Sequence, residues 1–175
     1  MNLRVATKSD LISLSTLASR TFLETYDDLT EEEGSTYIEE FFSESALADH
    51  LDSAKSQIFV VEDQQLVGYM LLSINTPPII LSDEPNIECV RLFLDQSVQG
   101  KGIGNRLLNT ALVWASENGF KVLWLKVWDQ NTSAISFYDK NQFSIIGNTS
   151  YTEGGMNDRV LIMEHIIDNG CSDGI

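Results

Sequence analysis

The sequence predicts an α/β fold: a mixed, mostly antiparallel twisted sheet of about seven strands flanked by about four helices. Short apolar runs of strand length alternate with longer stretches in which apolar residues recur every three or four positions. Three strand-like runs follow one another along the chain, which indicates antiparallel pairing in the first half. The chain has 175 residues, 43% of them hydrophobic, so one domain with a substantial core is expected over residues 1–168.

The amino-terminal part begins with a short strand and two helical regions. Thr7 starts the first helix, with Asp10 three residues on in an approximate capping box. The apolar face of this helix follows at spacings of three and four residues: Leu11, Leu14, Ala18 and Phe22. Thr30 and Glu33 repeat the capping signal, and Gly34 weakens the first turn of the second region, which allows a break there.

The remaining elements follow in the order β-β-β-α-β-α-β-β. The first two are strands at residues 58–61 and 66–72, joined by a short polar turn. A loop with all three prolines follows at residues 75–86, then a third strand at 87–94 and a long helix at 102–118. The next strand lies at residues 121–128, and Asn131 caps a short helix at 131–140. Two closing strands follow at residues 143–147 and 160–166. Gly119 ends the long helix, and residues 169–175 are expected to be a disordered tail.

The composition argues against several classes of partner and location. A net charge of −15 disfavours nucleic acid and anionic membranes, which are both bound through Lys and Arg. No run approaches the roughly 18 apolar residues of a membrane span, and the amino terminus lacks the pattern of a signal peptide. Cys89 and Cys171 are too few for a disulfide framework or a zinc site, and His50 and His165 stand alone. We expect a cytoplasmic protein that uses no metal; its oligomeric state stays open, a homodimer included.

The segment Gln99-Gly100-Lys101-Gly102-Ile103-Gly104 is the most informative in the chain. It lies between a predicted strand and a predicted helix, where glycines expose backbone N–H groups to a phosphate. A P-loop is excluded because no Lys-Ser or Lys-Thr pair stands at the start of the helix. A dinucleotide fingerprint needs Gly-x-Gly-x-x-Gly, and this loop is one residue short. The pattern that remains is Gln-x-x-Gly-x-Gly.

That pattern, formed by Gln99, Gly102 and Gly104, resembles the acyl-coenzyme A signature of the GCN5-related N-acetyltransferase (GNAT) family. A strand at residues 88–94 precedes it at the family's spacing, and residues 123–143 resemble the family's second half. The order of elements in the first half agrees with the family as well. Two shorter stretches are similar to PaiA-like spermidine/spermine acetyltransferases: residues 21–26 and 124–138.

The resemblance implies the GNAT fold, with acetyl-coenzyme A as the acetyl donor and no metal. The cofactor pyrophosphate would lie against the loop and the start of the next helix, at Gln99, Gly100, Lys101, Gly102, Ile103, Gly104 and Asn105. In the family, the preceding strand carries a bulge, splays from its neighbour and pairs with the pantetheine arm; here that falls on Leu92, Phe93 and Leu94. Asn131 and Tyr138 would also contact the cofactor, although helix capping alone explains Asn131.

Two residues are candidates for catalysis. Glu88 stands at the start of the strand before the loop, where some relatives carry a general base that takes a proton from the incoming ammonium. A solvated strand-end carboxylate is the competing explanation. Tyr138 matches a position where the family often places a general acid, and a phenol with a pKa near 10 can protonate a departing thiolate. A helix aromatic with a solvated hydroxyl explains Tyr138 without catalysis.

The acceptor is expected from the acidic first half, since 13 of the 26 acidic residues lie between Glu24 and Asp63. The family usually places its acceptor side there, so the resemblance implies a small cationic amine such as a polyamine, met by Glu24, Tyr26, Asp27, Asp28 and Tyr37. An acidic, solvated helix start explains the same charges. Two other functions stay open: acetylation of a protein or peptide amino terminus, and a non-catalytic regulator that binds acetyl-coenzyme A.

Overall fold

The computed structural model describes residues 1–26, 29–79, 84–152 and 158–167 of the chain. The strands are β1 (Asn2–Val5), β2 (Ser56–Asp63), β3 (Gln65–Ser73), β4 (Asn86–Leu94), β5 (Val122–Trp128), β6 (Ser144–Tyr151) and β7 (Asp158–Ile166). The α-helices are α1 (Leu11–Thr25), α2 (Glu31–Phe41), α3 (Glu44–Asp52), α4 (Ile103–Glu117) and α5 (Thr132–Lys140). The predicted α/β class and the predicted order of the strands are confirmed.

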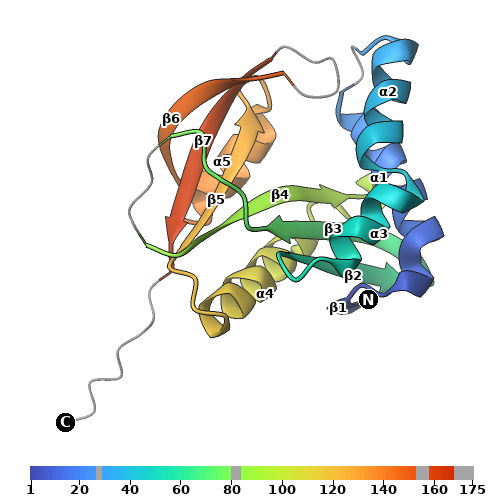
Figure 1. Ribbon diagram of the computed structural model, residues 1–175, viewed down its shortest axis with the longest axis horizontal. Helices are drawn as coiled ribbons and strands as arrows, with labels where there is room; N and C mark the ends of the chain where they lie inside the picture. The colour runs from blue at the N-terminus through green and yellow to red at the C-terminus, as the bar shows by residue number, and fades with distance from the viewer. Residues whose placement is uncertain (27–28, 80–83, 153–157, 168–175) are drawn as a thin grey trace.

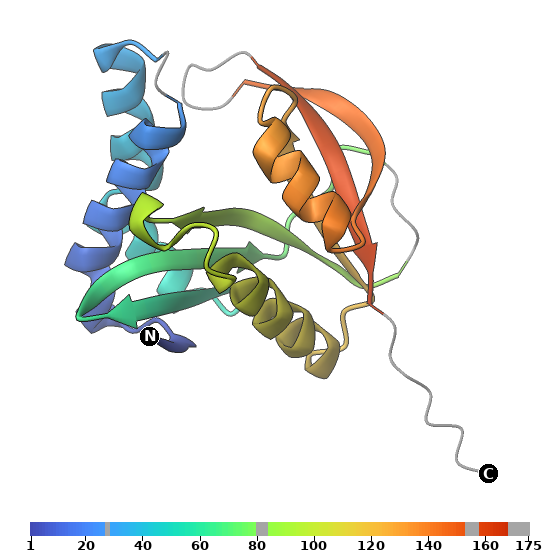
Figure 2. The same ribbon diagram turned by 180° about the vertical axis from the view of Figure 1, so that it is seen from behind.

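The seven strands form one sheet in the order β1-β2-β3-β4-β5-β7-β6. Neighbouring strands are antiparallel except β4 and β5, which are parallel. The helices α1, α2 and α3 lie on one face of the β1–β4 half, and α4 lies on the other face (Figures 1 and 2). The two large clusters of buried apolar side chains correspond to these two faces of the sheet.

The second predicted helical region is two helices in the structure, α2 and α3. Gly34 does not interrupt α2; it is buried, and a Cβ placed there would lie 3.0 Å from Leu23 Cδ2. The break comes later, where Phe42 has φ −121° and ψ 0° and the Ser43 side chain accepts a hydrogen bond from the Ala46 N–H. The described part of the chain therefore holds five α-helices rather than about four. A Ser N-cap was the stronger signal at this point, because it supplies an acceptor for the new helix.

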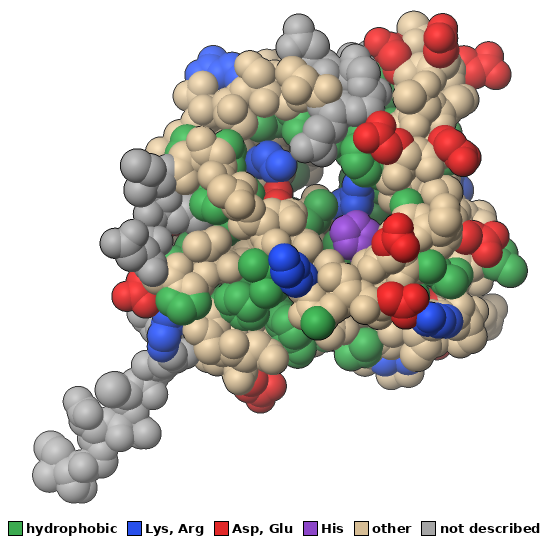
Figure 3. Space-filling view, in the orientation of Figure 1, with side chains coloured by type: hydrophobic (Ala, Val, Ile, Leu, Met, Phe, Trp, Pro, Cys, Tyr) green, Lys and Arg blue, Asp and Glu red, His purple; other side chains and the backbone are tan. Residues whose placement is uncertain are grey.

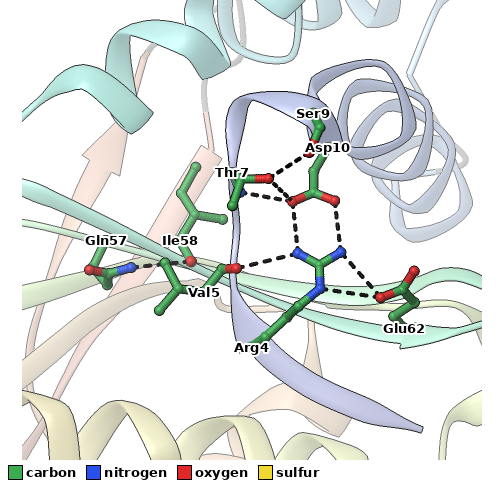
Figure 4. Close-up of polar contacts among 8 residues, drawn as sticks. All are labelled: Arg4, Val5, Thr7, Ser9, Asp10, Gln57, Ile58 and Glu62. Atoms are coloured by element: carbon green, nitrogen blue, oxygen red, sulfur yellow. Dashed lines mark hydrogen bonds and ion pairs between the residues drawn. The ribbon is translucent and has the colours of Figure 1, made fainter.

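An ion cluster joins β1, the start of α1 and β2 (Figure 4). The Arg4 Nη1 and Nη2 atoms each lie 2.8 Å from a carboxylate oxygen of Asp10, and Arg4 Nε lies 3.2 Å from Glu62 Oε2. Asp10 also accepts a hydrogen bond of 2.8 Å from the Thr7 N–H, as the predicted capping interaction requires. Hydrogen bonds from Arg4 hold the pKa of the Asp10 carboxyl well below its usual range.

Strand β4 contains a β-bulge. In its pairing with β3, Cys89 lies opposite Leu72 and Arg91 lies opposite Leu71, so Val90 is an extra residue on β4. Beyond the bulge, the alternation of side chains along β4 is reversed. Leu92 consequently packs with the cluster on the α4 face, whereas Phe93 packs with the cluster under α1–α3.

Strand β4 also separates from β5. The parallel pairs join residues 86–88 to residues 122–124 and then stop, although both strands continue. The two strands diverge from this point in Figures 1 and 2. Backbone groups of β4 beyond Glu88 therefore have no partner in β5. The bulge and the splayed strand that the resemblance implied are both present.

Within the described ranges, no helix is both long and apolar enough to cross a membrane. Cys89 is a buried free thiol, and burial, then the neighbouring Glu88, raises its pKa to about 12. The predicted tail at residues 169–175, which includes Cys171, lies outside the described residues.

Candidate functional site

The glycine loop leads directly into α4. Gly100 and Gly102 have φ values of 71° and 78°, in the left-handed region that favours glycine. The first backbone hydrogen bond of α4 joins the Arg106 N–H to the Gly102 carbonyl at 3.1 Å. The N–H groups of Ile103 and Gly104 therefore precede Arg106, the first N–H donor of the helix, and have no acceptor within α4. Together with the helix dipole, they make this end of α4 suitable for an anion.

A groove of about 650 Å³ runs beside this loop and is called the glycine-loop groove below. It is lined by Thr21, Glu24, Thr25, Leu92, Phe93, Leu94, Gln96, Gln99, Gly100, Gly102, Gly104, Asn105, Asn131, Ser133, Ala134, Phe137 and Tyr138. Most of the predicted cofactor contacts are thus brought together. Lys101 and Ile103 are absent from the lining, and Ile103 is buried in the core, so any contact from Ile103 comes from its backbone.

Close packing between α4 and α5 keeps the groove in shape. A Cβ added at Gly104 would lie 3.2 Å from Cε2 of the Phe137 ring, so a larger residue there would require the ring to shift by a few tenths of an ångström. The Asn141 side chain, just after α5, donates a hydrogen bond of 3.1 Å to the Asn105 side chain. At the start of α5, Asn131 accepts from the Ala134 N–H at 3.0 Å, which confirms its predicted capping role.

The end of β4 is tied to the loop by Gln99. Its side-chain Nε2 donates a hydrogen bond of 3.1 Å to the Leu94 carbonyl. Asp95 follows β4 and accepts from the Ser97 N–H at 2.8 Å, and Arg20 of α1 reaches its carboxylate at 2.6 Å. Hydrogen bonds from Ser97, then from Arg20, lower the pKa of Asp95 to about 2. The loop is therefore anchored to β4 and to α1 before it reaches the glycines.

Tyr138 lines the groove from α5 and is 8% exposed. Its ring contacts Phe137 and Phe143, with centroids 5.2 Å and 5.4 Å away. Burial, followed by the neighbouring Cys89 and Tyr26, raises the pKa of Tyr138 well above 10. The phenol thus keeps its proton at neutral pH. A solvated helix aromatic, the alternative considered from the sequence, does not describe this buried ring.

A second hollow, of about 410 Å³, lies under α1–α3 and is called the aromatic cavity below. It is lined by Phe22, Tyr26, Tyr37, Phe41, Phe42, His50, Asn75, Thr76, Glu88, Val90, Arg91, Phe93, Lys126, Trp128, Tyr151, Asp158 and Val160. Its volume falls in the range of small-molecule sites. The cavity is lined by side chains from three helices and four strands, so no single stretch of sequence predicts it.

Glu88 contributes a buried carboxylate to the aromatic cavity. It is 1% exposed, which rules out a solvated strand-end carboxylate. Its Oε2 accepts a hydrogen bond of 2.6 Å from Asn75, and Lys126 Nζ lies 3.3 Å from its Oε1. A buried charge needs such partners, because desolvation otherwise costs several kcal/mol per ion. Asn75 and Lys126 were not identified from the sequence.

The aromatic wall of the cavity includes both tyrosines expected to contact the acceptor. Tyr37 stacks on Phe22 at 4.3 Å, and its hydroxyl lies 2.8 Å from the Tyr151 hydroxyl. Tyr26 contacts Phe22 and, at 5.7 Å, Trp128. Burial, then Tyr37 and Asp158, raise the pKa of Tyr26 to about 12. These residues join α1 and α2 to the β5–β7 half of the sheet across the cavity.

Two further basic residues of the cavity, Arg91 and His50, were not predicted as functional. Arg91 is 7% exposed, and its guanidinium lies 4.8 Å from the centroid of Phe42 and 5.4 Å from that of Phe41. His50 lies 3.1 Å from the Ser56 hydroxyl, and burial, then the Arg91 charge, lower its pKa below the usual value. The signal for Arg91 was present in the sequence, since a lone Arg in an apolar strand needs a specific reason.

The acidic residues of the first half are not gathered in the aromatic cavity. Figure 3 shows Asp and Glu side chains over the outer surface of α2 and α3, with Lys, Arg and His side chains around the central hollow. Glu31, Glu32, Glu39 and Glu40 are all exposed. Glu24 lines the glycine-loop groove instead, whereas Asp27 and Asp28 lie outside the described residues.

Phe93 is the one residue common to the two linings as described. It lies on β4 beyond the point where β4 leaves β5, so the gap between these strands is where the groove and the cavity approach each other. Glu88 faces the cavity, and Tyr138 faces the groove. A buried carboxylate and a buried phenol thus flank the place where the contents of the two spaces could meet.

Comparisons with known proteins identify relatives across most of the chain. The family model described as "Acetyltransferase (GNAT) family" matches residues 15–143. An uncharacterised N-acetyltransferase of Mycobacterium tuberculosis is 28% identical over 160 residues, covering 89% of this chain and 98% of the relative. A peptidyl-lysine N-acetyltransferase of Salmonella typhimurium is 30% identical over 112 residues, covering 64% of this chain and 66% of the relative.

A solved structure resembles the fold closely. The PaiA N-acetyltransferase of Thermoplasma acidophilum, in complex with coenzyme A, superposes with a TM-score of 0.74. It is 25% identical and covers 95% of this chain and 99% of its own. No group of three or more His, Cys, Asp or Glu side chains suited to a metal occurs among the described residues. The groove, with its free helix-start N–H groups and positive-φ glycines, fits coenzyme A in this chain too.

Proposed function

The chain belongs to the acetyltransferase (GNAT) family, and we propose that it moves an acetyl group from acetyl-coenzyme A directly to a primary amine in the aromatic cavity. It is an N-acetyltransferase, with acetyl-coenzyme A as donor. Direct transfer is supported by Phe93, which lines both the groove and the cavity. The two spaces therefore approach each other where β4 separates from β5. No covalent acetyl-enzyme is needed when donor and acceptor can meet.

Glu88 is the candidate general base. Acetyl-coenzyme A supplies a thioester; the amine nitrogen attacks its carbonyl carbon, a C–N bond forms and the C–S bond breaks. An amine arrives as ammonium and loses two protons in becoming an amide. Glu88 takes the first, since its buried carboxylate lines the cavity that would hold the amine. That proton then passes to solvent.

Tyr138 is the candidate proton donor to the sulfur. It lines the groove, and its raised pKa keeps the phenol protonated. A thiol near pKa 8.5 is more acidic than this phenol, so full transfer is uphill and a hydrogen bond to the departing sulfur carries much of the effect. The second proton lost by the amine replaces any proton that Tyr138 donates to the sulfur, so the number of protons balances.

Substituting Glu88 tests this assignment. Glu88→Gln keeps the shape of the side chain but cannot take a proton, and its single amide oxygen can accept from only one of Asn75 and Lys126, so kcat near pH 7 should fall by about 100-fold or more. The rate of the variant should rise with pH as more amine is deprotonated in solution. The matched control is Glu84→Gln, at an exposed position outside both linings, which should behave as wild type.

The readouts are release of free thiol and calorimetric binding of coenzyme A. Unchanged binding of coenzyme A would show that Glu88→Gln is folded. A variant with wild-type kcat would remove Glu88 as the base. The amine panel should include spermidine, because the sequence predicted a polyamine acceptor, and a lysine peptide, because one relative is named for peptidyl-lysine.

A further inference from the structure

Arg91 carries a buried positive charge that the reaction described above does not use. Among the described residues it has no ion pair and donates no hydrogen bond, and its guanidinium lies over the rings of Phe41 and Phe42. Ring faces attract a cation but leave the five N–H groups of a guanidinium without acceptors. Those nitrogens are not sealed off, as the Tyr69 hydroxyl and Trp124 Nε1 are. They are therefore available to something in the aromatic cavity.

The bulge in β4 directs Arg91 into this cavity. In a regular strand, residues 88 and 91 would point to opposite faces of the sheet. The extra residue Val90 reverses the alternation, so Glu88 and Arg91 both line the aromatic cavity. Bulges commonly re-aim side chains next to active sites. The candidate base Glu88 and the guanidinium of Arg91 thus lie on the same strand, on either side of the bulge, and line the same cavity.

We propose that Arg91 binds a carboxylate carried by the acceptor, which is therefore a small amino-acid-like molecule with both an amine and a carboxylate. This inference rests on the proposed function, because it names the acceptor of that same reaction. A guanidinium and a carboxylate form two parallel hydrogen bonds, the strongest polar pairing that side chains offer. Glu88 would then face the amine of the same molecule.

The other charges of the cavity agree with this assignment. Lys126 and Glu88 pair with each other, and Asp158 has a partner of its own. Among the described lining residues, Arg91 is the charged side chain whose contacts are ring faces rather than an ion pair or a hydrogen bond. A polyamine would bring further positive charge next to it, and like charges repel strongly where burial lowers the dielectric. The aromatic rings of the wall favour an apolar side chain on the acceptor.

Matched amines with and without a carboxylate test the inference in the wild-type protein. We would compare L-phenylalanine with 2-phenylethylamine, L-methionine with 3-(methylthio)propylamine, and L-leucine with 3-methylbutylamine, and add spermidine. Each amino acid should exceed its decarboxylated partner in kcat/KM by roughly 10- to 100-fold. Equal or better turnover of the decarboxylated amines, or of spermidine, would overturn the inference.

Two variants locate the preference. Arg91→Gln should raise KM for the amino acids by roughly 10- to 100-fold and leave KM of the decarboxylated amines within about threefold. Arg91→Lys, which keeps the charge but not the two-pronged geometry, should fall between. The control is Arg159→Gln, on β7 between the lining residues Asp158 and Val160 but itself outside the lining, which should keep the preference. A preference that survives Arg91→Gln would contradict the role of Arg91.

Calorimetry separates this inference from the proposed function. L-Phenylalanine, titrated into protein loaded with coenzyme A, should bind to the wild type and not to Arg91→Gln. If it binds in this way but no amine is acetylated, the proposed function fails and the carboxylate site stands. If none of the three amino acids binds, the inference is wrong, whatever other amines are turned over.

Discussion

The glycine-loop groove and the aromatic cavity meet at β4 but are built in different ways. The groove is formed largely by two continuous stretches, residues 92–105 and 131–138, and much of what it offers is backbone N–H groups. The cavity is formed by side chains from three helices and four strands. A site made of contiguous backbone can be recognised as a motif. A site assembled from distant side chains becomes visible only when the chain is folded.

Among changes to the groove, the largest effect should come from its backbone. Gly102→Val places a β-branched residue at φ 78°, which strains the start of α4 where the N–H groups face the pyrophosphate. Calorimetry should show coenzyme A bound about 10- to 100-fold more weakly. The aromatic cavity should be unaffected.

Gly119→Val is the matched control for that change. Gly119 has φ 84° at the other end of α4, so the variant suffers comparable strain far from the glycine loop. It should lower the melting temperature without changing the affinity for coenzyme A. If both variants weaken coenzyme A equally, the loop backbone has no special role.

Tyr138→Phe should have a smaller effect, confined to the chemical step. Removing the phenol hydroxyl should lower kcat about tenfold, while binding of coenzyme A stays within about twofold. Because burial raises the Tyr138 pKa well above 10, the wild-type rate should show no decline from its ionisation up to about pH 10. Unchanged kcat in thiol-release assays would exclude Tyr138 from the reaction.

The smallest effect should concern stability at the anchor of the loop. Asp95→Ala removes a cap and the partner of Arg20, and should cost about 1 kcal/mol, or a few degrees in melting temperature. Asp52→Ala, which breaks an exposed pair with Lys8, should change less.

The pH dependence of this anchor follows from the lowered pKa of Asp95. Its folded pKa of about 2 lies below the unfolded value near 3.9. The stabilisation is therefore present above about pH 4 and is lost as pH falls toward 2. Asp95→Ala and wild type should converge in stability over that window; a constant difference would contradict the assignment.

The sequence predicted the groove well, because its signals are local. The glycine spacing, the flanking strand and Asn131 each have a direct structural counterpart: positive-φ turns, a splayed β4 and a capped α5. The capping signals at Thr7 and Thr30 were correct for the same reason. The predicted break at Gly34 was wrong, because a buried glycine does not interrupt α2. The break lies at the N-cap Ser43, which starts α3.

The sequence predicted the cavity only in part, because charge along a chain does not say which way side chains point. Acidic residues of α2 are neighbours in sequence of the cavity residues Tyr37 and Phe41, but their side chains are exposed on the outer surface of the helix. Glu88 was found, but Asn75 and Lys126, which hold its carboxylate, come from other elements. Arg91 enters the cavity only because a bulge changes the alternation of β4, and nothing local in the sequence marks a bulge.

A conjugate that spans both spaces tests the central claim most directly. The best amine from the thiol-release panel would be joined through an acetyl bridge to the sulfur of coenzyme A, and its dissociation constant compared with that of coenzyme A alone. If the groove and the cavity meet beside Phe93, the conjugate should bind at least about 100-fold more tightly, since its second half binds at no further translational cost. A conjugate that binds no more tightly than coenzyme A would show that the two spaces do not serve one reaction.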